Sequence, residues 1–303
     1  MSESLSIDRK GAGGCAEDAI TLAVCTNRME RFWHHLVSNR KALGPWDVAL
    51  CIVDSSSPPA RSVLAALEQA GVSVVCNPCN QGLSASRNRA LARCGTPYLL
   101  FVDDDATISP EVIDAVRDAF RRGAGAVGVR LQPPVELDLD RWFLGYGQYH
   151  YLALHRPDRR ISAWGACMGV DVAAVRRASL TFREGLGRTG RRLESGDDTT
   201  FLRELVAGGC ELALLDDAIC THHIAPERVR AGYLLRRAFW QGRSEIRRDN
   251  VRAGFIKELR RNLDCYAGDP LGVALGVVYL GAVVLGMVTE VFAFVTAGRP
   301  IRA

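Results

Sequence analysis

The chain has 303 residues, of which 48% are hydrophobic and 24% charged, so it can bury a large core and is not disordered. Its net charge of +4 is too small to indicate a nucleic-acid-binding protein, since such proteins gather many basic residues on one surface, and we expect no nucleic-acid partner. Residues 1–18 are polar and glycine-rich and lack the apolar stretch of a signal peptide. They predict a flexible tail before a domain that stays in the cytoplasm.

From residue 19 onward, short apolar runs rich in β-branched residues alternate with segments of helical length. The strands are expected at Ile20–Cys25, Val48–Val53, Val72–Cys76, Tyr98–Val102 and Ala126–Leu131. The helices are expected at Glu30–Ala42, Pro59–Ala70, Leu83–Cys94 and Pro110–Arg122. This alternation predicts an α/β domain over residues 19–225 with a mainly parallel sheet, which binds ligands beyond the carboxyl ends of its strands.

Three acidic residues, Asp103, Asp104 and Asp105, directly follow the apolar strand Tyr98–Val102. Neighbouring carboxylates repel one another, so at a strand end they favour a bound divalent cation. The alternative is a solvated acidic turn in which an aspartate caps the helix that starts at Pro110.

Residues 135–163 are irregular and rich in aromatic and polar side chains. A segment of this composition is typical of a loop that covers a binding cleft. A solvated insertion with a few anchoring aromatic residues is the alternative.

The C-terminal part of the chain changes character twice. Residues 226–268 carry eleven arginine and lysine residues interleaved with aromatic and aliphatic ones, which predicts a basic amphipathic helical region. Within residues 269–303, Leu271–Thr289 is an uncharged apolar run about long enough to span a bilayer, before Glu290 interrupts it. A basic region beside an apolar segment indicates contact with an anionic cytoplasmic leaflet. A buried helical hairpin that caps the domain is the alternative.

The order of several motifs resembles the family 2 glycosyltransferases of the GT-A fold. The family pattern N-x-G-x-x-x-x-R-N occurs at Asn80–Asn88, and a strand ending in D-x-D follows at Asp103–Asp105. Further similar segments are Cys25–Arg28, Ile52–Ser57, Trp164–Met168, Phe182–Gly187, Glu194–Leu202 and Thr221–His223. The resemblance covers roughly residues 19–245.

The resemblance implies a role for each matching residue. It places the nucleotide-sugar donor against Thr26, Arg28, Asp54, Arg87, Asp103, Asp104, Trp164, Gly165 and Asp197. It implies that Asp103 and Asp105, with His222 or else His223, hold a Mn²⁺ or Mg²⁺ ion at the diphosphate. Asp198 matches the catalytic base.

The activity implied is an inverting transfer of a sugar from a nucleoside diphosphate, by default uridine diphosphate, to an acceptor hydroxyl. A glycan or lipid-linked acceptor of the cell envelope, at the cytoplasmic face of the membrane, suits the C-terminal segment. The family's acidic pair is usually Glu-Asp, whereas this chain has Asp197-Asp198, which puts the role of Asp197 in doubt. One of the two could instead be the N-cap of a helix over Thr199–Ala207.

Two other functions fit parts of the sequence. Asp103-Asp-Asp-Ala-Thr107 also matches the first motif of haloacid-dehalogenase-type phosphatases, but no lysine, their common basic residue, occurs between Lys41 and Lys257. The other alternative is a membrane-bound scaffold that keeps the fold without activity. A scaffold would have no reason to retain Asp54, Asp105 and Asp198 together.

Overall fold

The structure is a computed structural model, and it describes residues 16–137, 148–157, 159–190, 192–248, 251–264 and 270–297. Its strands are β1 (Ile20–Thr26), β2 (Val48–Val53), β3 (Val72–Cys76), β4 (Tyr98–Val102), β5 (Ala106–Thr107), β6 (Ala126–Gln132), β7 (Cys167–Asp171) and β8 (Leu212–His222). Its helices are α1 (Met29–Lys41), α2 (Arg61–Gln69), α3 (Leu83–Arg93), α4 (Pro110–Arg121), α5 (Val172–Arg177), α6 (Asp197–Ala207), α7 (Ala231–Arg248), α8 (Val251–Asp264) and α9 (Pro270–Thr296). Three short 3₁₀ turns are η1 (Ala16–Asp18), η2 (Gln148–Leu152) and η3 (Pro226–Val229).

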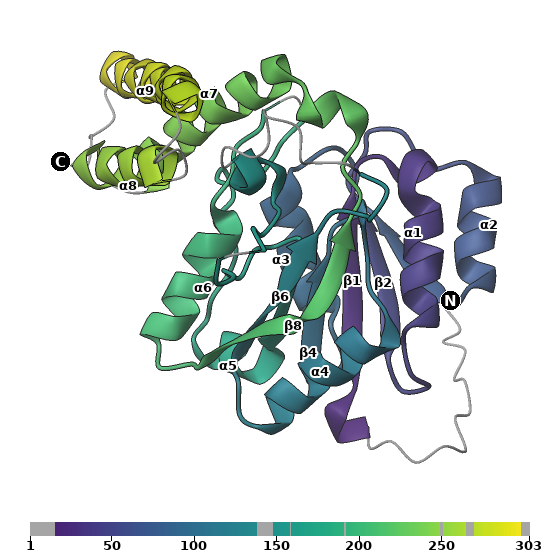
Figure 1. The fold of residues 1–303 in the computed structure, drawn as a ribbon. Helices are drawn as coiled ribbons and strands as arrows, with labels where there is room; N and C mark the ends of the chain where they lie inside the picture. Colours follow the sequence, from purple (N-terminus) through teal and green to yellow (C-terminus); the bar gives the residue numbers. More distant parts are fainter. Residues whose placement is uncertain are drawn as a thin grey trace.

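The strands form one mixed sheet in the order β3-β2-β1-β4-β7-β6-β8-β5 (Figure 1). Strands β1 to β4 are parallel to one another, and β6 is parallel to β8. Strand β7 runs antiparallel to both of its neighbours, β4 and β6, and β5 runs antiparallel to β8. The predicted α/β fold with a mainly parallel sheet is therefore confirmed.

Helices cover both faces of the sheet, which explains why its central strands are apolar on both sides (Figure 1). One hydrophobic cluster joins one face to α1, α2 and α4, through residues such as Leu36, Leu67 and Val116. A second cluster joins the other face to α3, α5 and α6, through Ala90 and Phe201 among others. The carboxyl ends of β1, β2 and β4 are left uncovered between these helices and lead into polar residues.

Two differences from the predicted boundaries concern the N-terminal tail and the acidic helix. Residues 16–18 of the predicted tail form the turn η1, while residues 1–15 lie outside the described part of the chain. Helix α6 begins at Asp197, two residues before the predicted start at Thr199. Its N-cap is Gly196, with a left-handed φ of 101°, so neither Asp197 nor Asp198 is the N-cap.

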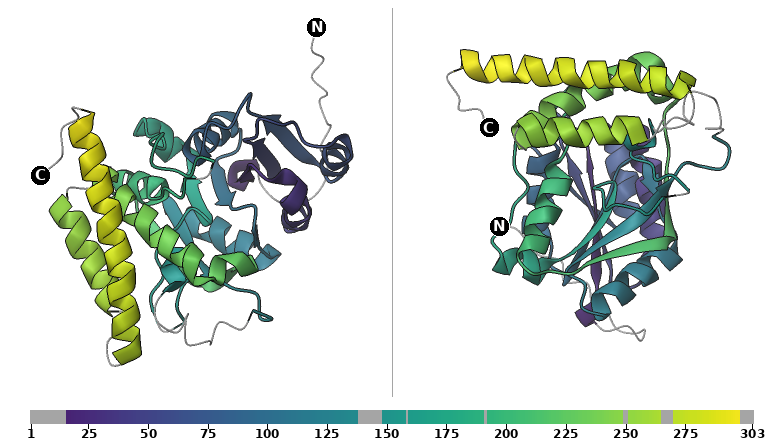
Figure 2. Two further views of the ribbon diagram at one scale, coloured as in Figure 1. Left: turned by 90° about the horizontal axis from the view of Figure 1, so that it is seen from above. Right: turned by 60° about the vertical axis from the view of Figure 1, so that its left-hand side comes forward.

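Helices α7, α8 and α9 pack on one another and form a layer at one end of the molecule, which we call the helical layer (Figure 2). Its own hydrophobic cluster includes Leu234, Ile246, Tyr279 and Met287, and residues Tyr151 and Leu152 of η2 join it from the α/β domain. Helix α9 lies along the outer edge of the molecule in the right-hand view of Figure 2.

Glu290 interrupts the apolar run of the sequence but does not interrupt the helix, because α9 continues through it. Its carboxylate is 1% exposed and receives hydrogen bonds from Nε of Arg243 at 2.7 Å and Nε of Arg247 at 2.6 Å, both on α7. Two cations from a neighbouring helix thus neutralise the one charge in the apolar run. Arg247 also forms an ion pair with Glu194, which ties the helical layer to the α/β domain.

Candidate functional site

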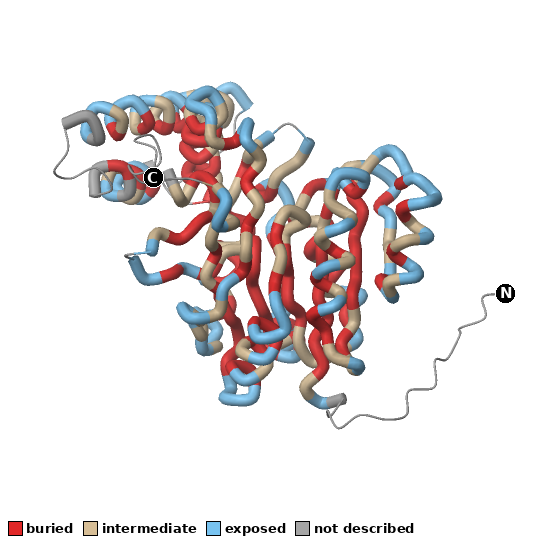
Figure 3. Tube along the Cα trace, turned by 45° about the vertical axis from the view of Figure 1, so that its right-hand side comes forward, coloured by how far each residue is buried: buried red, intermediate tan, exposed pale blue. Residues whose placement is uncertain are grey.

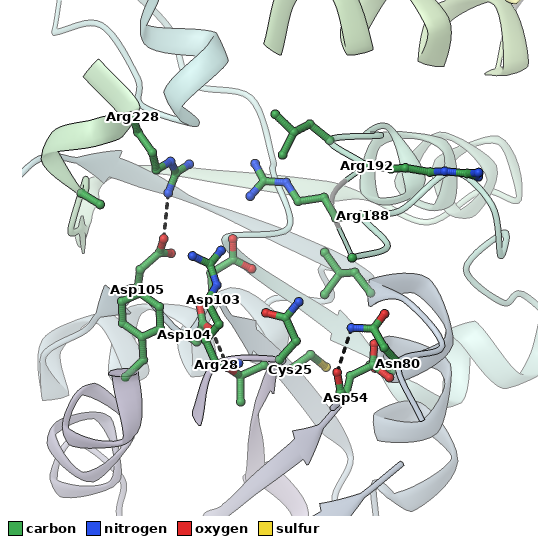
Figure 4. Close-up of a pocket in the computed structure, with 18 of the residues that line it drawn as sticks. Cys25, Arg28, Asp54, Asn80, Asp103, Asp104, Asp105, Arg188, Arg192 and Arg228 are labelled. Carbon is green, nitrogen blue, oxygen red and sulfur yellow. Dashed lines mark hydrogen bonds and ion pairs between the residues drawn. The ribbon is translucent and has the colours of Figure 1, made fainter. Parts of the chain in front are cut away.

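A cavity of about 200 Å³ opens at the carboxyl ends of β1, β2 and β4. We call it the acidic pocket (Figure 4). Its lining includes Thr26, Arg28, Asp54, Asn80, Asp103, Asp104, Asp105, Arg188, Arg192 and Arg228. Five of these ten residues, Thr26, Arg28, Asp54, Asp103 and Asp104, were predicted donor-binding residues, and Asp103 and Asp105 were predicted metal ligands.

Asp54 holds the loop that follows β3. One of its carboxylate oxygens accepts hydrogen bonds from Nδ2 of Asn77 and the backbone N–H of Gln81, both at 2.8 Å. The other accepts the backbone N–H of Gly82 at 2.8 Å. Asp54 is 5% exposed, so its carboxylate orders one wall of the acidic pocket, and its predicted contact with the nucleotide remains a prediction.

Asp104 faces Thr26 across the ends of β1 and β4. The Thr26 hydroxyl donates to the Asp104 carboxylate at 2.5 Å and accepts the backbone N–H of Arg28 at 3.0 Å. Burial, together with the negative charges of Asp105 and Asp103, raises the pKa of Asp104 to about 7 despite the Thr26 hydrogen bond. Asp104 is therefore poised to hold a proton near neutral pH.

Asp105 and His222 meet where β5 pairs with the end of β8. Nε2 of His222 lies 3.0 Å from Oδ1 of Asp105, and Nη1 of Arg228 lies 2.7 Å from Oδ2. Burial alone would raise the pKa of Asp105, but the charges and hydrogen bonds of His222 and Arg228 outweigh it and lower the pKa. Asp105 is held as a carboxylate, the state in which a cation binds it.

These side chains fit a divalent cation. One ligand atom from each of Asp103, Asp105 and His222 can be chosen so that all three lie within 4.8 Å of one another. His222 points Nδ1 at the backbone oxygen of Ala153, 3.1 Å away, which leaves Nε2 toward the carboxylates. A histidine ligand that donates its other ring N–H to a carbonyl is the usual arrangement at metal sites, and two carboxylates with one imidazole suit Mn²⁺.

His223, the other predicted candidate, points elsewhere. Its Nε2 lies 2.9 Å from the Thr107 hydroxyl, and its ring stacks on His35 with 4.4 Å between centroids. Among the described residues, the three-ligand set therefore contains His222 and not His223.

Arg87 lies in α3 and is 3% exposed. Its guanidinium contacts Asp197 at 2.7 Å and Asp103 at 3.5 Å. Burial opposes its charge, but the neighbouring carboxylates outweigh burial and raise the pKa of Arg87. Arg87 thus links the acidic residues of β4 and α6, and the predicted role near the phosphates stays a prediction.

A second cavity, of about 150 Å³, lies between the start of α6 and the helical layer, and we call it the Asp198 pocket. The predicted residues Arg87, Asp103, Trp164, Asp197 and Asp198 line it. The predicted loop 135–163 contributes His150 and Ala153, whereas its residues 138–147 and 158 lie outside the described part of the chain.

The Asp198 carboxylate is fixed by two backbone N–H groups. Gly165 donates to Oδ2 at 2.7 Å, and Thr199 donates to Oδ1 at 2.7 Å. A Cβ at Gly165 would lie 2.2 Å from Nη2 of Arg87, so only glycine fits between this arginine and Asp198. The predicted Gly165 therefore positions Asp198.

The two pockets are neighbours, because Leu83, Asp103 and Arg188 line both of them. In Figure 4 the guanidinium groups of Arg188 and Arg228 point toward one another on the same side of the acidic residues. Neither arginine was predicted as a site residue: Arg188 sits in an irregular loop, and Arg228 sits in the short turn η3. A ligand bound against both Asp103 and Arg188 would therefore extend from the acidic pocket into the Asp198 pocket.

Comparisons with known proteins agree with this geometry. Residues 25–181 match the family described as glycosyl transferase family 2. A search of curated proteins returned no match.

Many solved structures share the fold, among them the following three. The mannosyltransferase PcManGT from Pyrobaculum calidifontis, in complex with GDP-Man and Mn²⁺, is 15% identical with a TM-score of 0.57, over 92% of this chain and 79% of that one. S. aureus TarS 1-349, in complex with UDP, is 14% identical with a TM-score of 0.50, over 93% of both chains. A mycobacterial protein is 13% identical with a TM-score of 0.51, over 79% of this chain and 80% of that one.

Family membership decides between the two enzyme classes that Asp103–Thr107 had left open, in favour of sugar transfer and against phosphatase chemistry. The acidic strand end, the buried carboxylate that follows β2 and the paired aspartates of α6 all lie on one α/β scaffold of the GT-A type. The chain belongs to glycosyl transferase family 2 and is a glycosyltransferase.

Proposed function

We propose that this glycosyltransferase moves a sugar from a nucleoside diphosphate to an acceptor hydroxyl with inversion at the anomeric carbon, assisted by a divalent cation. The observation that carries the proposal is the convergence of Asp103, Asp105 and His222 on one pocket, with Asp198 in the pocket beside it. A donor-side cation site and an acceptor-side carboxylate are the two parts that such a transfer needs.

The donor occupies the acidic pocket, with its nucleoside toward Thr26, Arg28 and Asp54 and its diphosphate toward Asp103 and Asp105. Uridine diphosphate is the default nucleotide. The related structures support a nucleotide-sugar donor in general, since PcManGT was solved with GDP-Man and TarS 1-349 with UDP. Arg188 and Arg228, which face the same space, add positive charge for the diphosphate.

Asp103, Asp105 and His222 hold the cation, Mn²⁺ or Mg²⁺. When bound, this ion supplies Lewis-acid stabilisation of the charge that gathers on the departing diphosphate. Arg228, which pairs with Asp105 in this structure, would pair with the diphosphate and so leave the Asp105 carboxylate to the ion.

Asp198 accepts the proton of the acceptor hydroxyl as that hydroxyl attacks. A carboxylate can do so only within hydrogen-bond reach and with a fixed orientation, and the N–H groups of Gly165 and Thr199 provide that orientation. Asp197 is paired with Arg87 and buried, so it positions the site without taking the proton.

The acceptor is a glycan or lipid-linked molecule of the cell envelope, taken at the cytoplasmic face of the membrane. Residues of α7 and α8, including Arg237, Gln241 and Lys257, wall the Asp198 pocket. The acceptor-side pocket therefore lies against the same helical layer that carries the apolar helix α9, through which we propose membrane contact.

The test is a release assay with the purified full chain and Mn²⁺ across sugars of uridine, guanosine and thymidine diphosphates. At least one donor should release its nucleoside diphosphate, and the product anomer should be opposite to that of the donor. Retention of the anomer would overturn inversion. The absence of release and transfer for every donor and acceptor tried would favour the scaffold alternative.

A further inference from the structure

The outer face of α9 is an apolar surface that nothing in the described part of the protein covers. Its exposed residues are Val277, Leu285, Val288, Phe292 and Val295, with exposed fractions of 56%, 60%, 60%, 68% and 61%. They recur at intervals of three, four or eight residues, so they share one side of the helix. Figure 3 shows exposed positions on the outer side of this layer and buried positions on its inner side.

The inner face of α9 is fixed to the rest of the protein. Gly286 lies so close to α7 that a Cβ there would be 1.9 Å from the backbone oxygen of Phe239, and a Cβ at Gly242 would be 1.9 Å from the backbone oxygen of Val283. Glu290 on the same inner face is held by Arg243 and Arg247. Helix α9 therefore cannot leave α7 without separating a tight backbone contact and a buried cluster of three charges.

This attachment decides how α9 can meet a bilayer. The segment Val273–Thr296 has a mean hydropathy of 2.1, and by length and composition it is the one described helix that could cross a membrane. If it crossed, α7 would have to enter the hydrocarbon with it, together with the charges of Arg243, Arg247 and Glu290 at their contact. Charged side chains at that depth are costly, whereas a helix lying in the interface buries only its apolar side.

The charge of the helical layer favours an anionic membrane surface as the partner of this apolar face. Helices α7, α8 and α9 contain nine arginine and lysine residues against four aspartate and glutamate residues, a net charge of +5, while the whole chain carries +4. The exposed residues Phe255 and Ile256 of α8 extend the set of apolar side chains in this layer, and Arg252 and Arg260 of α8 are exposed as well. An apolar face on a cationic layer matches a surface of anionic lipid.

We infer that α9 is an in-plane anchor: its outer face enters one leaflet of an anionic membrane, and the helix does not span the bilayer. This adds an orientation to the membrane contact proposed above. Since α7 and α8 wall the Asp198 pocket, an anchored helical layer also holds that pocket near the membrane surface. Vesicle binding is measured without sugar transfer, so this inference and the proposed function can fail separately.

The first test is sedimentation of the full chain with vesicles of neutral phosphatidylcholine or of phosphatidylcholine with phosphatidylglycerol. We expect at least tenfold stronger partition to the anionic vesicles. The double variant Leu285→Glu/Phe292→Glu should lose at least tenfold of that binding. The control Val206→Glu/Leu214→Glu makes the same charge change at residues 41% and 43% exposed on the α/β domain, and it should bind like the unchanged protein.

The second test is topology in spheroplasts of an expressing bacterium, with one epitope at each end of the full chain. Both epitopes should be protected until the cells are lysed. Exposure of the C-terminal epitope alone would show a spanning helix and overturn the inference. Binding that is absent, or unchanged by Leu285→Glu/Phe292→Glu, would overturn it as well. If that variant instead converted a dimer to a monomer and the chain bound no vesicles, the face would belong to a second copy.

Discussion

Arg228 donates a hydrogen bond from Nη1 to Oδ2 of Asp105 at 2.7 Å, so an internal cation sits on the carboxylate that we assign to the metal. Under the proposed function, the arginine and the metal ion would compete for this carboxylate while no nucleotide is bound. The ion pair would then favour binding of the metal together with the diphosphate, because the diphosphate would give Arg228 a new partner.

Arg228→Gln should therefore strengthen Mn²⁺ binding in the absence of nucleotide. Removing the arginine ends the competition and also removes a positive charge beside the site. We expect a roughly tenfold lower Kd, equivalent to about 1.4 kcal/mol. Isothermal titration of the nucleotide-free protein with Mn²⁺ measures the Kd, with Arg121→Gln, at a side chain 50% exposed at the end of α4, as the control. Weaker Mn²⁺ binding in Arg228→Gln would contradict the proposed competition.

Asp198→Asn should leave donor binding unchanged and lower turnover roughly 10²–10⁴-fold, since an amide cannot accept the proton. The N–H of Gly165 can still donate to the amide oxygen, so the local structure should persist. The kcat for transfer and the Kd for the donor check the two halves of the prediction. Asp118→Asn, at a carboxylate 54% exposed on α4, is the control. A variant that keeps full turnover would remove Asp198 from the role of base.

Arg87→Met should destabilise the fold by about 3–5 kcal/mol, because it leaves the buried carboxylate of Asp197 without its cation. Urea unfolding measures the change. The double variant Arg87→Met/Asp197→Asn should regain part of the loss, since the buried charge left unpaired by the first substitution is gone. Equal stability of the single and double variants would show that charge pairing is not the cause.

The pH dependence of stability should include a contribution from His155. Burial lowers the pKa of His155 from 6.5 to about 4, and its Nδ1 accepts the backbone N–H of Leu131 at 2.8 Å. Because the folded pKa lies below the ordinary value, the stability that this group contributes is complete above pH 6.5 and is lost as the pH falls toward 4.

His155→Gln should therefore flatten the stability curve between pH 6.5 and pH 4 relative to the unchanged protein. Urea unfolding at each pH, followed by tryptophan fluorescence, measures the curve, and Trp164, one of the five tryptophans, stacks on the His155 ring with 4.2 Å between centroids. Parallel curves for the two proteins over this range would contradict the assigned role of His155.

Local sequence patterns were sufficient to predict the positions of strands in the first half of the sheet. Strands β2, β3 and β4 occur at their predicted residues, because their apolar β-branched runs are bounded by turns and helices. Strands β5 and β7 were not predicted, since they are short and depend on partners distant in sequence. Glu290 shows the same limit: its neutralisation by Arg243 and Arg247 depends on residues more than forty positions earlier.

In the candidate site, too, some residues could be predicted from the local sequence and others depend on the tertiary fold. Asp103 and Asp105 stand beside a strand, so their position at the sheet edge followed from the sequence, and His222 was found through the resemblance. Arg188 reaches the site from an irregular loop, and nothing in its sequence surroundings indicates that it lines both pockets. Contacts of this kind depend on the tertiary fold and are visible only once it is known.

The most direct measurement is a thermal-shift screen of nucleoside diphosphates and their sugars, with and without Mn²⁺, on the full chain and on Asp105→Asn. A ligand that binds only the folded protein raises its Tm. The account predicts that at least one nucleotide raises the Tm of the unchanged protein more with Mn²⁺ than without it, and that Asp105→Asn abolishes this difference. A metal-dependent shift that survives in Asp105→Asn would show that the cation is held elsewhere.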